Sequence, residues 1–226
     1  MRSLETNPIN QIRLYILTSG FLGVSSIALS TMEWLPMHQT AQFIVLPAYI
    51  FVAIIGFQFR EIGQHIVKGF IYGVIAVALY DLSRLPFLLV GWTDFIPNIG
   101  KWLLNSDQAN GFIGYFWRYF LNGGGLGISF MMLIRVFNIR RRHLVLGLLY
   151  GFAIFMGLVI TLLFAPKGEH FLFEITKLSF TGGLIGHLIF GVTLGYFTKN
   201  IHSSDQRNDY IFKAGTSLIS SASNLK

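Results

Sequence analysis

Two charged residues lie within a segment of the chain that otherwise has the composition of a lipid-soluble helix. The stretch ALYDLSRLPF (78–87) holds Asp81 and Arg84 among apolar side chains. A spacing of three residues places both side chains on one face of a helix, within bonding reach of each other. Charges inside a membrane are costly unless they are paired or hydrated, so these residues indicate an ion pair or a site for a polar solute.

Further charged residues occur in other apolar segments, at a comparable depth. Glu174 and Lys177 repeat the spacing of three, Arg118 precedes Asn122 by four residues, and Glu33 ends the first segment. Three acids therefore balance three bases. The candidate substrate-binding residues are Asp81, Arg84, Arg118, Asn122, Glu174 and Lys177.

Three interpretations of this charged set stay open. In the first, the side chains form a dry ion-pair network that fixes the order of the helices. In the second, they line a hydrated cavity that binds a small polar or charged solute. In the third, the long side chains extend to the membrane interface.

Motifs of the common enzyme classes are missing from the sequence. G-x-S-x-G, H-E-x-x-H and phosphate-binding loops do not occur, and the chain has no cysteine. His187 shares a helical stripe with Gly183, Gly191 and Gly195, and no second histidine stands at a suitable ligand spacing. We therefore expect no catalysis and no bound cofactor or metal.

The composition is that of a membrane protein. Of the 226 residues, 53% are hydrophobic and only 12% are charged, which is too little charge to cover a soluble globule of this size. The net charge of +7 does not indicate nucleic-acid binding, because the basic residues lie in short loops between apolar segments. The expected surroundings are the lipid bilayer.

Six apolar segments are long enough to cross a bilayer, which takes about 20 residues. The sequence predicts an all-α membrane protein, a six-transmembrane-helix bundle forming a single domain over 1–198, followed by a polar cytoplasmic tail at 199–226. The first segment is expected to remain in the protein, because it is longer than the apolar core of a secretory signal and no small-x-small site closes it. The expected helices lie near 13–33, 40–59, 65–90, 111–134, 143–164 and 171–198.

Basic residues are distributed unevenly between the two sets of loops. One set holds two, Lys101 and Lys167. Loops rich in Lys and Arg stay in the cytoplasm, so both termini are predicted to be cytoplasmic, with loops 91–110 and 165–170 outside. The cytoplasmic set comprises Arg2, Arg13, Arg60, Lys68, Arg135, Arg140, Arg141, Arg142, Lys199, Arg207, Lys213 and Lys226.

The helices are expected to form three related hairpins. Segments 20–36, 69–86 and 147–166 each begin with closely spaced glycines and end at a proline. RYFLNGGGLG (118–127) also aligns without gaps on KLSFTGGLIG (177–186). Shared composition is the other explanation of so short a similarity. True repeats would be parallel, because each hairpin begins on the cytoplasmic side.

Glycines four residues apart form smooth stripes on the later helices. In lipid, small residues drive helix association by letting two backbones approach closely, so we expect the stripes to pack helices together. Space for a ligand or a sliding helix is the alternative. The pairs are Gly69 and Gly73, Gly123 and Gly127, Gly147 and Gly151, and Gly191 and Gly195.

The loop after the third segment, at 91–111, contains an apolar stretch of its own. FIPNIGKWLL (95–104) is too apolar for a solvated loop and too short to span a membrane. It predicts a re-entrant or interfacial segment, with Trp92 and Trp102 at headgroup level, that covers the charged cluster as a lid. An amphipathic helix on the surface is the alternative.

Three short motifs occur in a fixed order along the chain: YDLSR (80–84), FIPNIG (95–100) and NGGGLG (122–127). Together they resemble a pattern in a group of uncharacterised small multi-pass bacterial membrane proteins. Members of that group often carry a histidine shortly before the Asn-Gly, where this chain has Arg118. The resemblance implies a bacterial inner-membrane setting and supplies no function.

Two functions of different class follow from the sequence. The first is a small-solute binding or transport protein with a charged cavity in the outer half of the bilayer. Transport also needs a helix that can break, for which Pro47 is a candidate. The second is a structural or accessory subunit of a larger membrane complex or a homo-oligomer, in which the charges form an ion-pair clasp.

Overall fold

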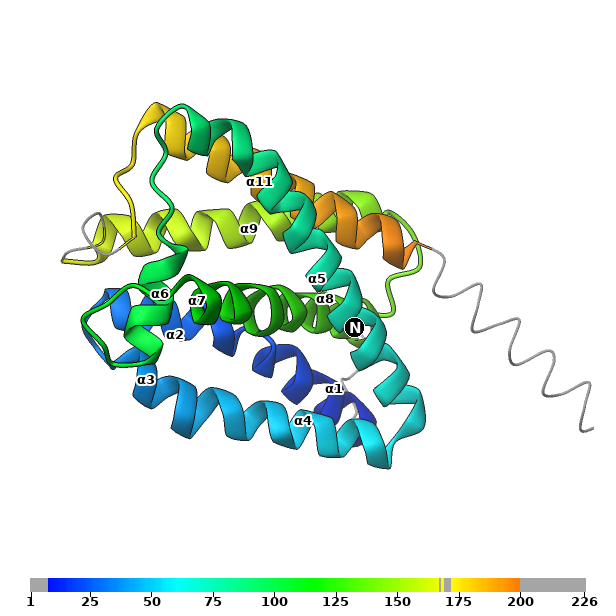
Figure 1. Ribbon diagram of the computed structural model, residues 1–226. Coiled ribbons are helices and arrows are strands. Elements are labelled where there is room, and N and C mark those ends of the chain that lie inside the picture. The colour runs from blue at the N-terminus through cyan, green and yellow to red at the C-terminus, as the bar shows by residue number, and fades with distance from the viewer. Residues whose placement is uncertain (1–7, 167, 169–171, 200–226) are drawn as a thin grey trace, which may run out of the picture.

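The computed structural model describes residues 8–166, 168 and 172–199. Every regular element within these ranges is a helix (Figure 1). Five helical stretches there are long and apolar enough to cross a membrane, and a bent pair of helices makes a sixth if it is counted as one span. The all-α class is therefore as predicted, and the length and apolar character of the helices are those of a membrane protein, while the six-span bundle stays a prediction.

The first span is bent rather than continuous. α1 (Pro8–Ser19) and α2 (Leu22–Thr31) meet at an angle of 41°, so the prediction of one helix over 13–33 was wrong. The break contains Gly20, and glycine weakens a helix interior by about 0.5–1 kcal/mol. Gly20 also presses against Gly125 of another helix, where a Cβ would lie 3.2 Å from the Gly125 carbonyl carbon. The bend therefore coincides with a close backbone contact between Gly20 and Gly125, which a residue with a side chain would prevent.

The second span, Met37–Gln58, is continuous but locally widened. It comprises α3 (Met37–Thr40), the π-helical turn η1 (Ala41–Val45) and α4 (Leu46–Gln58). Pro47 has no N–H, and its ring would clash with a carbonyl one turn earlier, so the backbone widens just ahead of it. Pro47 thus changes the winding of this span without breaking it.

The third span, α5 (Arg60–Leu89), is 30 residues long. A short helix, α6 (Ile96–Leu103), follows it and folds back onto the bundle. Ile96 and Ile99 are buried there, as expected of a segment within the protein. Trp92 is buried, with its ring centroid 5.4 Å from that of Phe173, and its predicted position at headgroup level stays a prediction.

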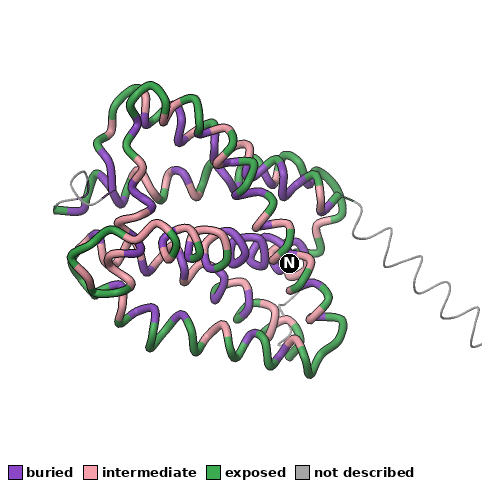
Figure 2. The backbone as a smooth tube through the Cα atoms, in the orientation of Figure 1, coloured by how far each residue is buried: buried purple, intermediate pink, exposed green. Residues whose placement is uncertain are grey.

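The fourth span lies at the centre of the molecule. α7 (Gly111–Phe116), the π-helical η2 (Trp117–Gly124) and α8 (Gly125–Val136) follow one another without a break. Of its most apolar stretch 72% is buried, against 28% for α5 and for α9 (His143–Phe164). Figure 2 shows this burial as continuous purple along α8.

The last hairpin consists of α9 and α11 (Lys177–Thr198). α11 begins six residues later than the predicted helix at 171–198. Thr176 sets this start, because its Oγ1 accepts a hydrogen bond from the Ser179 N–H at 3.1 Å while the Ser179 hydroxyl oxygen accepts one from the Thr176 N–H at 2.9 Å. This reciprocal cap satisfies two backbone donors that the first helical turn leaves unpaired.

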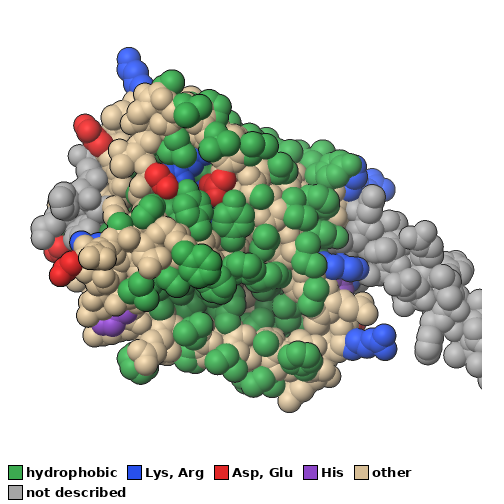
Figure 3. Space-filling model, in the orientation of Figure 1, with side chains coloured by type: hydrophobic (Ala, Val, Ile, Leu, Met, Phe, Trp, Pro, Cys, Tyr) green, Lys and Arg blue, Asp and Glu red, His purple; other side chains and the backbone are tan. Residues whose placement is uncertain are grey.

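α8 separates two groups of helices (Figure 1). α1, α2 and α4 lie on one side of it, and α9 and α11 lie on the other. α5 crosses between the groups and contacts α4, α8 and α11. Figure 3 shows hydrophobic side chains across one face of this assembly, as a lipid-facing surface requires, with basic side chains gathered at its right edge.

Glycines hold α5 against the central span. A Cβ on Gly69 would lie 2.8 Å from the Gly127 carbonyl oxygen, and a Cβ on Gly73 would lie 2.8 Å from the Gly123 carbonyl carbon. Neither position has room for a side chain. Close contact between the two backbones stabilises the helix pair through van der Waals packing, and larger side chains would hold the backbones apart.

Glycines also join α9 to α11. A Cβ on Gly147 would lie 3.0 Å from the Gly195 nitrogen, and a Cβ on Gly151 would lie 3.1 Å from the Gly191 nitrogen. The packing role predicted for the glycine stripes is therefore confirmed on both helix pairs.

The two aligned segments of the proposed repeat pack differently. Gly127 lies against the backbone of α5, whereas Gly186, at the aligned position of α11, faces the ring of Tyr80. The internal repeat stays a prediction, as do the cytoplasmic termini. The predicted tail beyond Lys199 and half of the loop at 165–170 lie outside the described residues.

We expect Gly127→Leu and Gly191→Leu each to destabilise the protein, because each side chain would collide with the backbone of a neighbouring helix. Overpacking of this kind costs about 1–3 kcal/mol. Thermal unfolding in mild detergent measures the effect. Gly157→Ala is the control, since a Cβ there meets no atom within 4 Å. Equal melting temperatures for all three variants and the wild type would remove the packing role.

Reporter fusions after Ser106 and Arg140 test the orientation. The uneven distribution of basic residues predicts that a reporter after Ser106 is exposed outside and that one after Arg140 stays in the cytoplasm. A pair of reporters active on opposite sides, alkaline phosphatase and green fluorescent protein, gives reciprocal signals. Signals from the same side at both positions would contradict the predicted topology.

Candidate functional site

An ion pair between Asp81 and Arg118 joins α5 to the central span. Arg118 Nε donates to both carboxylate oxygens, at 2.9 Å and 3.1 Å, and Nη2 donates to Oδ1. The arginine side chain is 12% exposed and the aspartate side chain 17%. Two-pronged charge-assisted bonds in a mostly buried setting are among the strongest polar contacts that a protein makes.

Arg118 lies on the π-helical segment η2, which widens the central span at the height of the pair. A π-helix shifts the carbonyls out of their usual i→i+4 partnership, and such segments often occur at functional sites. Here the Leu121 carbonyl accepts a hydrogen bond from the Tyr49 hydroxyl at 2.9 Å. The Arg118 guanidinium carbon also lies 4.6 Å from the ring centroid of Tyr80, a cation–π distance.

A second ion pair joins α5 to the segment that precedes α6. Arg84 Nη2 donates to Asp94 Oδ1 at 2.9 Å. The Arg84 side chain is 1% exposed, and its guanidinium carbon lies 4.7 Å from the ring centroid of Trp92 and 5.2 Å from that of Phe95. A carboxylate and two aromatic rings thus replace the water that this cation would have in solution.

Asp94 was not among the predicted site residues, yet it organises the start of α6. Its Oδ1 also accepts the Ile96 N–H at 3.2 Å, and its Oδ2 accepts the Tyr115 hydroxyl at 2.9 Å. Asp94 stands one residue before the N-cap residue, Phe95, and its bond to the N–H two residues on is an Asx turn at the entry to the helix. That signal was present in the sequence and identifies Asp94 as the anchor of the apolar loop segment.

The predicted pairing of Asp81 with Arg84 was therefore wrong. Each residue instead binds a charge on another element: Asp81 binds Arg118, and Arg84 binds Asp94. Two separate pairs neutralise two arginines, whereas a pair along one helix would leave Arg118 without a carboxylate. The guanidinium fork also matches a carboxylate better across helices than along one helical turn.

Glu174 and Lys177 do not join these pairs. Both are exposed, at or just before the start of α11, and neither forms an ion pair with a described residue. The expected pairing between them is not found. Glu33 is exposed in the turn after α2, where its φ of 59° is left-handed.

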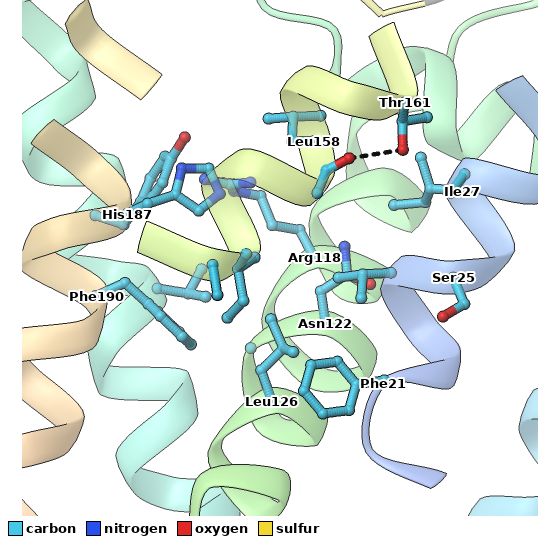
Figure 4. A pocket seen from close by; sticks show the side chains of 18 of the residues that line it. Phe21, Ser25, Ile27, Arg118, Asn122, Leu126, Leu158, Thr161, His187 and Phe190 are labelled. Carbon is cyan, nitrogen blue, oxygen red and sulfur yellow. Dashed lines mark hydrogen bonds between the residues drawn. The ribbon is translucent and has the colours of Figure 1, made fainter. Parts of the chain in front are cut away.

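A cavity of about 370 Å³ lies beside Arg118, between α2, η2, α9 and α11. Figure 4 shows Arg118 and Asn122 entering it from η2, His187 from α11 and Ser25 from α2. Most of the wall is apolar or aromatic. Phe95 and Ile99 of the loop and α6 form part of its lining, so the predicted lid is in contact with the cavity.

Three polar groups on the wall can meet a ligand. The bonds from Arg118 to Asp81 use Nε and Nη2, so Nη1 makes no bond to the carboxylate. His187 Nδ1 lies 2.7 Å from the Gly183 carbonyl oxygen. A carbonyl can only accept, so Nδ1 carries the proton and Nε2 of the neutral ring is an acceptor. The Ser25 hydroxyl is the third group.

Of the six predicted binding residues, Arg118 and Asn122 line the cavity. Asp81 lies behind Arg118 as its counter-charge. The Asn122 Oδ1 atom is buried without a hydrogen-bond partner, close to where a Cβ on Gly23 would be, at 2.9 Å.

His187 and Tyr80 belong to the cavity wall although the sequence did not mark them as binding residues. Their rings meet edge to face with centroids 5.0 Å apart. A lone histidine on a glycine stripe gave too weak a signal to assign. Among the described residues no group of three or more His, Cys, Asp and Glu side chains is placed to hold a metal ion.

Comparison with known proteins finds no matching family model, no matching curated protein and no matching solved structure. The proposals about function therefore depend on the geometry of the charged pairs and the cavity.

A pair of double-mutant cycles tests the ion pairs. Removing one partner of a buried pair costs about 3–5 kcal/mol. We expect Asp81→Asn and Arg118→Gln to show a coupling energy of about 2 kcal/mol or more in thermal or chemical unfolding. The matched control is Asp81→Asn with Arg84→Gln, for which the coupling should stay below about 1 kcal/mol. The reverse order of the two couplings would contradict the observed pairing.

Proposed function

We propose that the chain is a multi-pass protein of a bacterial inner membrane, with both termini in the cytoplasm, that binds or transports a small solute. The observation that carries the proposal is the cavity of about 370 Å³ beside the Asp81–Arg118 pair. Ligand sites usually have volumes of about 300–1,000 Å³, mostly apolar walls and a few polar groups. Under the predicted topology, the cavity lies toward the outer half of the bilayer.

The bent first span supports this proposal. Phe21, Val24 and Ser25, at or just beyond the break, line the cavity. Discontinuous helices commonly form the substrate sites of membrane transporters, because irregular backbone is tolerated there only when it lines a cavity or lies inside the protein. In this proposal, the helix break that transport needs lies at Gly20, whereas the sequence had suggested Pro47 for it.

The use of the glycines also supports a self-contained protein. An accessory subunit that docks through small residues needs them on its outer surface. Gly69, Gly127, Gly147 and Gly191 are instead in contact with other helices of the same chain. These stripes are therefore already occupied.

The two ion pairs favour the second candidate, a structural or accessory subunit held by an ion-pair clasp. Arg84 is enclosed by Asp94 and two rings, so this pair fixes α6 to α5 whether or not a solute binds. A clasp and a binding site are compatible within one molecule. The two candidate functions differ in whether the cavity holds a ligand.

Filling the cavity tests the proposed function. Gly157 of α9 lines the cavity, and a Cβ there meets no atom within 4 Å. We expect Gly157→Phe to fold and to lose any bound small molecule. Leu163→Phe is the matched control, since Leu163 lies on the same helix and is exposed.

Native mass spectrometry after purification in mild detergent reports retained molecules and partners together. A small molecule on the wild type and on Leu163→Phe, but not on Gly157→Phe, is the expected result. A protein partner in fixed stoichiometry, with no small molecule on any variant, would instead favour the accessory subunit.

A further inference from the structure

We infer that the solute is an electrically neutral, largely apolar molecule with a hydroxyl-type head, one that both accepts and donates a hydrogen bond. This inference rests on the proposed function and specifies the ligand of the same cavity. It follows from the charge balance of the wall, from the pairing of one donor with one acceptor, and from the mostly apolar remainder of the lining.

The charge balance of the wall excludes a strong preference for ions. Of the residues that the structure describes, Arg118 is the only charged one that lines the cavity. Asp81 holds its guanidinium by three hydrogen bonds, so the pair has no net charge. An anion would be attracted by Arg118 and repelled by Asp81 just behind it, and a cation would face the opposite balance. Neither gains enough to replace its hydration in a mostly apolar site.

A donor and an acceptor stand at the same end of the cavity. The ring of Tyr80 contacts both side chains: the Arg118 guanidinium carbon lies 4.6 Å from its centroid, and the His187 ring lies 5.0 Å away. Arg118 Nη1 offers N–H groups that Asp81 does not use, and His187 Nε2 offers a lone pair. A hydroxyl group can accept from the first and donate to the second. A carboxylate has no proton for His187, and an ammonium has no lone pair for Arg118.

The rest of the lining fits an apolar body. The hydrophobic part of the wall includes Val24, Ile27, Leu126, Ile154 and Phe190. Burying apolar surface stabilises a complex by roughly 25 cal/mol per Å². Such a molecule partitions into lipid, and the cavity lies within membrane-spanning helices.

Three ten-carbon compounds with different heads test the inference: decan-1-ol, decanoate and decylammonium. Each competes with the neutral fluorescent probe N-phenyl-1-naphthylamine for the protein in lipid nanodiscs. Signals from empty nanodiscs and from the Gly157→Phe variant are subtracted, so that only displacement from the cavity counts. We expect decan-1-ol to displace the probe at concentrations at least about tenfold lower than either ion.

Removing the counter-charge gives a second readout. Asp81→Asn leaves Arg118 with an unbalanced positive charge, so we expect decanoate to gain about tenfold relative to decan-1-ol while decylammonium weakens further. The wild-type comparison decides the inference even if this variant fails to fold.

The outcomes separate this inference from the proposed function. Displacement that depends on Gly157 but favours decanoate or decylammonium would overturn the neutral-ligand inference and leave the binding site standing. Probe fluorescence that is the same for wild type and Gly157→Phe would overturn both. A preference for decan-1-ol that Gly157→Phe abolishes supports both.

Discussion

Buried charges in this protein must find their counter-charges within the chain, because hydrocarbon offers neither water nor ions. Arg118 and Arg84 meet this constraint through acids on different elements, Asp81 on α5 and Asp94 ahead of α6. The two pairs fix η2 and the segment leading into α6 to the same turns of α5. The wall of the cavity and the segment that borders it therefore depend on the neutralisation of two arginines.

The cavity exists because the helices diverge along α11. At Gly195 and Gly191 the neighbouring atoms belong to the backbone of α9, so the two helices are as close as helices can be. Farther toward the start of α11, Gly183 meets the ring of Phe155 of α9, and Gly186 meets the ring of Tyr80 of α5. An aromatic ring between two helices holds their axes apart, whereas a glycine pair does not. Side-chain size thus sets where space opens in the bundle.

Patterns that depend on one segment at a time were predictable from the sequence. The spans, the packing of Gly127 and Gly191 and the buried apolar loop segment all follow from hydropathy and residue size. The partners of the charges did not follow, because spacing along one helix favours Asp81 with Arg84 and gives no information about Arg118 on another helix. The bend at Gly20 was missed for the same reason, since its cause is a backbone contact with a distant part of the chain.

The order of the charges along the chain keeps each ion pair between neighbouring segments. Of the five continuous spans in the described part of the chain, Gly111–Val136 is the least apolar, with a mean hydropathy of 1.2, and it carries Arg118 into the bilayer. Asp81 lies on the preceding span, so the acid comes before its base along the chain. Arg84 is likewise followed by Asp94 after only ten residues. Each buried arginine therefore pairs with an acid on a neighbouring segment of the chain, and neither pair uses a residue of α9 or α11.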